Sequence, residues 1–356
     1  MESQTDRRAM LAAAAGLGGL AVLTRQAGAG PLTPPGAPAS TGRTTTEIFD
    51  DVQAAGGSRI PVNTLPAGGG FQHQITQPGA YVLTANINTS GSAALLVSAN
   101  DVDIDFNGFS LINTSSTSGP GVSVGSGFHR TRIHNGAIRG TFFALSLNDE
   151  SIVERMRISG FGTRAIAIDN DCIVRDCLIR GGTGVQLTAG DRCLVVNSTF
   201  SGSSAIIAGS QFQIDRCTLE TTTGANFGIQ CGGISRVSNC IVRNYAVAGI
   251  TVNDTSAVEG CVLNNNGDGI ILNDNCLARG NNVDFHPQGV GIKIQGSRSR
   301  LVENHICRAA TGIEATAGDN IAYGNTILDC SIIVNGPAGN SFPLTTFSLT
   351  DRKSTR

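Results

Sequence analysis

Residues 228–327 repeat one pattern five times: GIQCGGISRVSNCIV (228–242), GITVNDTSAVEGCVL (249–263), GIILNDNCLARGNNV (269–283), GIKIQGSRSRLVENHI (291–306) and GIEATAGDNIAYGNTI (312–327). Each copy begins with a Gly-Ile pair in a short alternating apolar run. It then passes through Gly, Asn, Asp or Ser and ends in a second apolar run. Alternation over so few residues is typical of short β-strands. A fixed period over consecutive copies indicates a solenoid, in which each repeat packs on its neighbours.

One position of this repeat, usually a small or polar residue, can be followed upstream to residue 107. Its members, called the corner column below, are Asn107, Gly136, Met156, Cys177, Ser198, Cys217, Cys240, Cys261, Asn281, Asn304 and Asn325. The first interval is 29 residues, and every later interval lies between 19 and 23 residues. The chain is therefore expected to form about 11 coils of about 21 residues each.

Apolar residues flank the corner column in every coil, and we expect them to form the core. Three positions before the column stand Ile104, Ile133, Val153, Val174, Val195, Ile214, Val237, Val258, Ala278, Leu301 and Ala322. Two positions after it stand Phe109, Ile138, Ile158, Ile179, Phe200, Leu219, Val242, Leu263, Val283, Ile306 and Ile327.

The period is compatible with a leucine-rich repeat or with a parallel β-helix. The Leu-x-x-Leu-x-Leu run of leucine-rich repeats is missing, and the intervals leave no room for a helix. The fold class predicted is therefore all-β, a single-stranded right-handed parallel β-helix.

Stacked turn residues lie over their counterparts in the next coil, so Asn amides can form a hydrogen-bonded ladder. Cys at the same position behaves as a small buried apolar residue. A second column, five residues earlier, contains Cys172, Cys193 and Cys276. Stacked neighbours have parallel Cβ directions, which suits a disulfide poorly. We therefore expect buried free thiols, and no zinc-finger site because the chain has no C-x-x-C.

The N-terminus carries features of export. The twin arginine Arg7-Arg8, the uncharged stretch 9–23 and the small residues 27–29 resemble a twin-arginine signal over residues 1–29. An uncleaved N-terminal anchor is the alternative. We expect a periplasmic, cell-surface or extracellular protein without stable membrane insertion once the signal is removed.

The remaining boundaries follow from composition. Residues 30–46 read as a Pro/Gly/Thr-rich linker. Residues 47–92 read as an N-terminal cap that begins with a short helix over 47–55, capped by Thr46 and ended by Gly56-Gly57. The β-helix is assigned to 93–334, and residues 335–356 to a C-terminal cap and tail. With 25 basic and 27 acidic residues, the chain has no basic stripe for binding nucleic acid.

The GI-x-V or GI-x-I run followed by V-x-x-(N/C)-x-(I/V) resembles the right-handed parallel β-helix superfamily, which includes pectate lyases, polygalacturonases and NosD-like periplasmic repeat proteins. The resemblance covers roughly residues 93–334. It implies an acidic polysaccharide bound along one strand face. It also implies calcium-binding acids with a basic residue in lyases, or paired Asp in hydrolases.

The strand that begins each copy has an outward row in which such groups are expected. The row predicted is Ala167, Gln186, Ile206, Gln230, Thr251, Ile271, Lys293 and Glu314. It contains one Lys, one Glu and no carboxylate pair.

The turn after that strand contains Asn253-Asp254 and Asn273-Asp274 at equivalent positions of neighbouring coils. Two stacked carboxylates raise one pKa or bind Ca²⁺, so Asp254 and Asp274 are candidate catalytic residues and candidate calcium ligands. The alternative is ordinary Asx turn chemistry.

A second candidate group is Asp268, Asp284 and His286, in the long turns of adjacent coils, with Lys293. Together they would supply a general base. The alternative is that they are solvated turn residues.

Two functions remain open at this stage. In one, the protein binds, or cleaves as a lyase or glycoside hydrolase, an acidic polysaccharide of the envelope or the medium. In the other, it is a non-catalytic structural or adhesive scaffold. The sequence does not define an oligomeric state.

Overall fold

The computed structural model describes residues 59–90, 93–113, 119–203, 205–222, 224–342 and 346–348. All of them fall within one compact unit, Gln53–Arg356. The signal predicted over 1–29, the linker over 30–46 and the helix over 47–55 lie outside the described residues. Within the described ranges the helical structure is one 3-10 turn, η1 (Val62–Thr64), and no helix there could cross a membrane.

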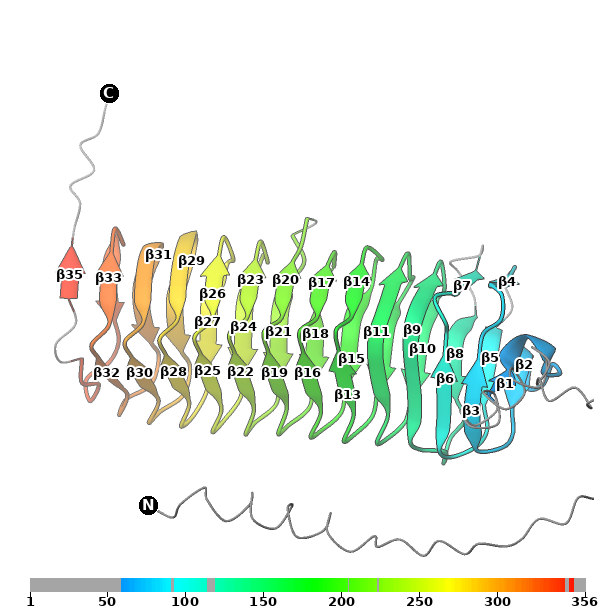
Figure 1. The fold of residues 1–356 in the computed structure, drawn as a ribbon. Helices are drawn as coiled ribbons and strands as arrows, with labels where there is room; N and C mark the ends of the chain where they lie inside the picture. Colours follow the sequence, from blue (N-terminus) through cyan, green and yellow to red (C-terminus); the bar gives the residue numbers. More distant parts are fainter. Residues whose placement is uncertain are drawn as a thin grey trace, which may run out of the picture. The chain divides into compact units, whose positions relative to one another are not determined.

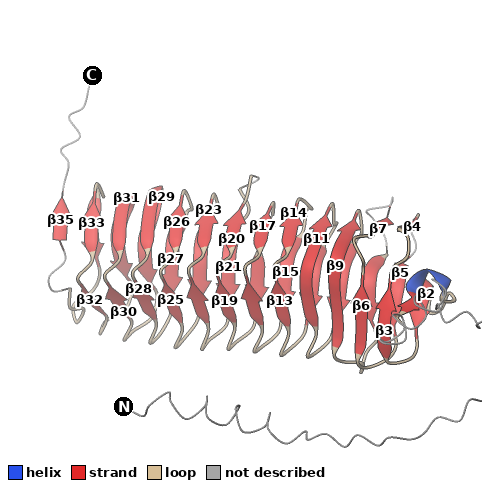
Figure 2. Cartoon of the chain, viewed as in Figure 1, coloured by secondary structure: helices blue, strands red, loops and turns tan. Residues whose placement is uncertain are grey.

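The described strands stack as successive coils along one axis (Figures 1 and 2), and each coil contributes to three parallel ladders. Ladder 1 consists of β2 (Phe71–Ile75), β5 (Ala93–Val97), β8 (Pro120–Val124), β10 (Phe143–Leu147), β12 (Arg164–Ile168), β15 (Val185–Ala189), β18 (Ile206–Ala208), β21 (Phe227–Cys231), β24 (Ala248–Val252), β27 (Asp268–Leu272), the second halves of β29 (Asn282–Ile294) and β31 (His305–Ala315), and β34 (Ile332–Asn335).

Ladders 2 and 3 close each coil. Ladder 2 consists of β1 (Ile60–Pro61), β3 (Gly79–Val82), β6 (Val102–Asp105), the first halves of β9 (Thr131–Arg139) and β11 (Ile152–Ser159), β13 (Ile173–Arg175), β16 (Leu194–Val196), β19 (Gln213–Asp215), β22 (Arg236–Ser238), β25 (Ala257–Glu259), β28 (Leu277–Arg279), β30 (Arg300–Val302) and β32 (Ile321–Tyr323). Ladder 3 consists of β4 (Ile87–Thr89), β7 (Ser110–Asn113), the second halves of β9 and β11, β14 (Leu178–Arg180), β17 (Thr199–Ser201), β20 (Thr218–Glu220), β23 (Ile241–Arg243), β26 (Val262–Asn264), the first halves of β29 and β31, β33 (Thr326–Leu328) and β35 (Thr346–Ser348).

The prediction of a right-handed parallel β-helix is confirmed, with about 13 turns instead of about 11. The additional turns come from residues 60–89, which the sequence analysis assigned to the cap 47–92. There, β2 pairs with β5 and β3 pairs with β6, as in later coils. These first coils lack the Gly-Ile pairs and the corner column, so the repeat cannot be recognised from their sequence.

The predicted core is confirmed. All eleven residues three positions before the corner column are fully buried, and of the eleven two positions after it only Phe109 is half-buried. The exception has a local cause, because the corner at Asn107-Gly108 is two residues longer than in the next coil: strand pairing matches Ile104 with Ile133 but Leu111 with Ile138. Phe106 turns inward over Gly136, and Asn107 is exposed with φ +50°. Asn107 is therefore not a member of the interior column.

The asparagine ladder is confirmed at the C-terminal end. Asn281 Nδ2 donates to Asn304 Oδ1, and Asn304 Nδ2 donates to Asn325 Oδ1, each over 2.9 Å. The same oxygens accept backbone N–H groups, and each amide also donates to a carbonyl of an earlier coil. These buried amides hold three coils in one register.

All ten cysteines are free, and nine of them are buried. Burial raises the pKa of the Cys177 and Cys231 thiols to about 12, so both stay protonated and unreactive near neutral pH. The interior columns are thus filled by small apolar or hydrogen-bonded groups along their length.

An ionic stack on the outer side of ladder 2 adds a second tie between coils. Glu154 is 3% exposed and accepts hydrogen bonds from Arg132 of the preceding coil, over 3.1 Å, and Arg175 of the following coil, over 2.6 Å. Burial by itself raises the pKa of this carboxyl, but the two guanidinium groups outweigh burial and hold the pKa at about 2.

We predict that this carboxylate makes stability pH-dependent. Its folded pKa of about 2 lies below the ordinary value of 4.5 for a glutamate carboxyl, so its contribution is present above about pH 4.5 and is lost as the pH falls towards 2. Glu154→Gln should lower the free energy of unfolding on the order of 2 kcal/mol at pH 7. Urea unfolding of both proteins from pH 7 to pH 2 measures the difference.

The difference between the two proteins should shrink below pH 4.5. Glu150→Gln is the matched control, because Glu150 is 55% exposed and lies 3.6 Å from Arg130, so it should change stability by about 0.5 kcal/mol or less. A Glu154 effect that stays constant over the whole pH range would contradict the assignment.

Candidate functional site

The Asp254 and Asp274 carboxylates lie in the corner that links ladder 1 to ladder 2. Asp254 Oδ1 accepts the backbone N–H of Asp274 over 3.2 Å, and Asp274 Oδ1 accepts that of Ser297 over 2.5 Å. Each carboxylate therefore holds the turn of the next coil. Asn170 and Asp191 repeat this contact in the same corner of other coils.

These backbone hydrogen bonds explain why Asp occupies both turn positions, without a catalytic role. Among the described residues, no group of three or more His, Cys, Asp or Glu side chains is arranged to hold a metal ion. Calcium binding and catalysis at Asp254 and Asp274 stay predictions.

The second predicted group is divided between the outside and the inside of the solenoid. On the outer side of ladder 1, Lys293 Nζ lies 3.9 Å from Asp268 Oδ2 and 3.4 Å from Glu314 Oε2. Asp268 Oδ1 also accepts the backbone N–H of Val290 over 2.8 Å. The three side chains form a half-buried ion cluster over adjacent coils.

His286 and Asp284 do not join that cluster. His286 is fully buried in the corner between ladders 3 and 1, where its Nδ1 lies 2.8 Å from the Asn266 carbonyl oxygen. Desolvation lowers the pKa of this imidazole, which favours the neutral form inside the core. Asp284 faces outward on ladder 3 and is paired through both oxygens with Arg308.

The outward row of ladder 1 differs from the prediction at two positions. Strand pairing places Thr188 and Ile207 in the row with Ala167 and Gln230, while Gln186 and Ile206 are buried. Both coils lack the Gly-Ile pair: Gln186-Leu187 and Ala205-Ile206 stand in its place. The prediction therefore had the wrong register in these two coils.

A group that the sequence analysis did not single out lies on the outer side of ladder 3. Arg139 of β9, Arg157 of β11 and Arg180 of β14 line a shallow hollow with Ile158, Ser159 and Leu178. All three arginines are exposed, and Leu178 is half-buried between them and the core. We call this feature the arginine hollow.

Strand pairing defines the spacing of the three guanidinium groups. Arg139 and Arg180 occupy one row with Ser159 between them, whereas Arg157 pairs with Leu178 in the neighbouring row. At about 4.8 Å per strand, Arg139 and Arg180 are separated by roughly 10 Å along the solenoid. The third guanidinium group, Arg157 of the middle coil, lies to one side of the line from Arg139 to Arg180.

None of these arginines is paired with a carboxylate of the described residues, in contrast with several arginines of ladder 2 and its corners in the same or the next coils. Arg132, Arg155 and Arg175 contact Glu154, and Arg192 contacts Asp171. The hollow therefore concentrates three positive charges without internal compensation. Guanidinium groups of this kind suit planar anions such as carboxylates, which they bind through paired hydrogen bonds.

Hydroxyl groups continue the surface on the next coils. The row of Arg139 and Arg180 proceeds to Ser201, and the row of Arg157 and Leu178 proceeds to Thr199 and Thr218. These side chains can donate to and accept from sugar hydroxyls. A signal for the hollow was present in the sequence, because from Gly136 onward the outward positions of ladder 3 lie one and three residues after the corner column.

Comparison with known proteins agrees with the fold. The model of a sequence family described as a right handed beta helix region matches residues 144–283. No curated protein matches the chain.

Solved structures give the same result. A double mutant of a periplasmic alginate epimerase is similar over 81% of this chain and 82% of that chain, with a TM-score of 0.52 and 12% identity. A mutant tailspike protein of E. coli bacteriophage HK620, in complex with a pentasaccharide, gives a TM-score of 0.47 and 15% identity over 85% of this chain and 62% of that chain. The mannuronan C-5 epimerase A-module of Azotobacter vinelandii gives 0.31 and 10% over 85% and 93%. At these identities the alginate epimerase supports the fold alone.

The turn contacts of Asp274 generate a prediction. Asp274→Ala removes the acceptor for the Ser297 N–H and should lower the free energy of unfolding by about 1 kcal/mol. Asp274→Asn keeps an acceptor oxygen and should be close to neutral. Thermal unfolding of the two variants measures the difference, and equal stability of the alanine variant and the unchanged protein would contradict a structural role.

Proposed function

We propose that the protein binds an acidic polysaccharide through the arginine hollow, after export to the periplasm, the cell surface or the medium. The observation that carries the proposal is the set of three outward guanidinium groups, on consecutive coils, without a carboxylate partner among the described residues. Export rests on the twin-arginine pattern of residues 1–29.

The geometry favours a polymer over a small anion. The arginine hollow extends over three coils, which carry Arg139, Arg157 and Arg180. A polymer can therefore contact all three charges at different points along its length. The hollow does not enclose one point at which a small anion would be held. A polyuronate carries carboxylates at regular intervals, and it can place them against successive arginines while its ring faces cover Leu178. The hydroxyls of Thr199 and Ser201 extend the contact beyond the charges.

The proposal is one of binding. The carboxylates that the sequence suggested as catalytic groups accept backbone N–H groups or are ion-paired, and among the described residues no carboxylate or imidazole lines the arginine hollow. The structures similar in fold carry names connected with alginate and oligosaccharides, with which the proposal agrees, but the proposal itself rests on the arginines.

We predict that Arg157→Gln weakens binding of polygalacturonate about tenfold, because a charge-assisted hydrogen bond contributes about 1.5 kcal/mol or more. The Arg139→Gln/Arg157→Gln/Arg180→Gln variant should lose binding. Isothermal titration of purified residues 30–356 at low and high ionic strength measures both effects, and affinity should fall with salt.

Arg243→Gln is the matched control. Arg243 lies in the same outward row of ladder 3, is exposed and has no ion pair among the described residues, but it does not line the hollow. Arg243→Gln removes the same charge and should change the affinity for polygalacturonate less than twofold. If the triple variant binds as tightly as the unchanged protein, or the control loses as much, the hollow is not the binding site.

A further inference from the structure

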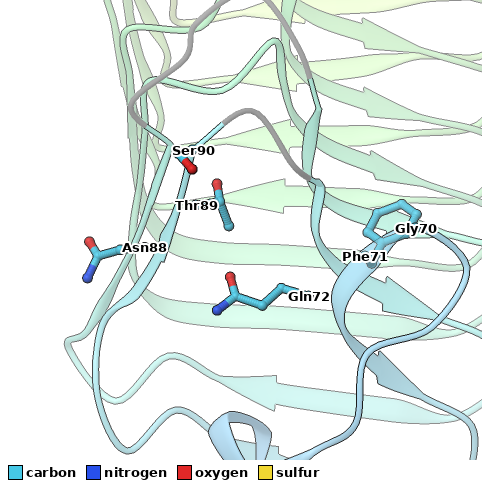
Figure 3. A pocket seen from close by; sticks show the side chains of 6 residues that line it. All are labelled: Gly70, Phe71, Gln72, Asn88, Thr89 and Ser90. Atoms are coloured by element: carbon cyan, nitrogen blue, oxygen red, sulfur yellow. The ribbon is translucent and has the colours of Figure 1, made fainter.

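Two hollows of the described surface differ in how their side chains are arranged. The one near the N-terminal end of the coils is lined by Gly70, Phe71, Gln72, Asn88, Thr89 and Ser90 (Figure 3). Its side chains diverge, because Asn88 points away from Gln72 and the Phe71 ring lies on the other side of β2. The arginine hollow, in contrast, presents three like charges on one outer face, and their order along the solenoid is regular.

The three cations of the arginine hollow alternate between two neighbouring rows of ladder 3. Arg139 and Arg180 belong to one row, and Arg157, on the coil between them, belongs to the other. The outward position beside each arginine on its own strand is uncharged, and these positions hold Ala137, Ser159 and Leu178. Each coil therefore offers one guanidinium group and one small, hydroxyl or apolar side chain, and the two exchange sides from coil to coil.

The spacing of these charges follows from strand geometry. Consecutive coils are roughly 4.8 Å apart, and two residues of one strand that face the same side are separated by roughly 7 Å. Arg157 is therefore displaced from Arg139 by one coil along the solenoid axis and by one row across it. Arg180 returns to the first row after one more coil, so the positive charges form a zigzag with one charge per coil.

A chain of 1→4-linked uronates presents its carboxylates in a matching pattern. Each sugar unit advances the chain by about one strand spacing, roughly 5 Å, and successive units are turned about the chain axis, so neighbouring carboxylates point to different sides. The opposite edge of each unit carries hydroxyl groups, which can bond to Ser159, and a ring face can cover Leu178. Because a guanidinium group binds a carboxylate through paired hydrogen bonds, three consecutive units can each be held by one arginine.

The same rows show where the cationic surface ends towards the C-terminus. After Arg180 the row continues with Ser201 of β17 and Glu220 of β20. Glu220 is exposed and accepts a hydrogen bond from Asn244 over 3.3 Å. Its carboxylate lies two strand spacings beyond Arg180, or roughly 10 Å, and repels an acidic chain that reaches it. An acidic chain therefore gains no charge contact by extending over β20.

We infer that the arginine hollow recognises consecutive uronates: it binds three adjacent units of a 1→4-linked homopolyuronate, whose carboxylates contact Arg139, Arg157 and Arg180 in turn. This assignment rests on the proposed function and narrows the ligand class. Carboxylates on every second unit of a polymer can match Arg139 and Arg180, but they leave Arg157 without a partner. Arg157 is therefore the residue that distinguishes a block of uronates from an alternating copolymer.

The test compares two acidic oligosaccharides with three carboxylates each, titrated into the protein of residues 30–356. Trigalacturonate contains uronates alone, whereas the hyaluronan hexasaccharide alternates glucuronate with a neutral amino sugar. Trigalacturonate should bind at least about fivefold more tightly. Arg157→Gln should weaken the trigalacturonate complex about tenfold and the hyaluronan complex less than about twofold, whereas Arg180→Gln should weaken both.

A second variant moves the middle charge and keeps the number of charges. Arg157→Ser/Ser159→Arg places the third guanidinium group in the row of Arg139 and Arg180, so the three cations form a line. Trigalacturonate should then bind at least about fivefold more weakly, and the hyaluronan hexasaccharide should not. Thermal unfolding checks that this variant is folded, and Arg157→Gln tests the same contact if it is not. Arg243→Gln is again the control and should change neither affinity.

Several results would contradict recognition of consecutive uronates. They are a hyaluronan complex as tight as the trigalacturonate complex, no binding of trigalacturonate, an equal effect of Arg157→Gln on both ligands, or full trigalacturonate affinity in the variant with the moved charge. In each case the proposed function stands if the Arg139/Arg157/Arg180 glutamine variant still loses polygalacturonate. If that variant keeps polygalacturonate, the proposed function fails as well.

Discussion

The structure depends on coil-to-coil register. Each coil must return the chain to the same place after three strands, because the ladder hydrogen bonds of each described coil run to the coils before and after it. The interior columns enforce that return. A side chain at a corner meets its counterpart one strand spacing away, so it must be small and apolar, like Cys261, or carry its own partner, like Asn304, which donates to Asn325 and accepts from Asn281.

The same register arranges the outward side chains in regular rows. A residue that recurs at one position becomes part of a straight row, so Arg139 and Arg180 share one row although they are far apart in the sequence, and Arg157 lies in the neighbouring row. The interior places almost no restriction on these outward positions, and charge there can be paired or unpaired. Glu154 shows the paired case, in which Arg132 and Arg175 tie three coils together. Arg139, Arg157 and Arg180 show the unpaired case, which leaves their charge available to a ligand.

Much of the interior could be predicted from the sequence, because burial imposes the same residue types on every coil. The residues flanking the corner column are buried as expected, and Asn281, Asn304 and Asn325 form the ladder. The prediction was wrong where a coil departs from the pattern. A longer corner moves Asn107 outside and brings Phe106 in, and missing Gly-Ile pairs shifted the register at Gln186 and Ile206. A slip of one residue is enough to move a side chain to the other face.

The site was less accessible from sequence than the core. Asp254 and Asp274 were candidates because Asn-Asp recurs at equivalent positions of neighbouring coils, yet their oxygens accept turn N–H groups. His286 and Lys293 are close in sequence, but one is buried and the other faces outward. The arginine hollow depends on which arginines lack a carboxylate partner in neighbouring coils, and that is a property of contacts across the ladder. Sequence spacing marks these positions as outward, but it does not show which charges are neutralised.

We propose that an acidic polymer lies along the solenoid axis, across the strands of ladder 3. A crystal structure of residues 30–356 with a bound uronate oligosaccharide tests it most directly. The expected ligand crosses β9, β11 and β14, with its carboxylates against Arg139, Arg157 and Arg180. A ligand bound instead on the outer side of ladder 1, at Lys293 and Glu314 or at the Asp254 and Asp274 turn, would contradict it.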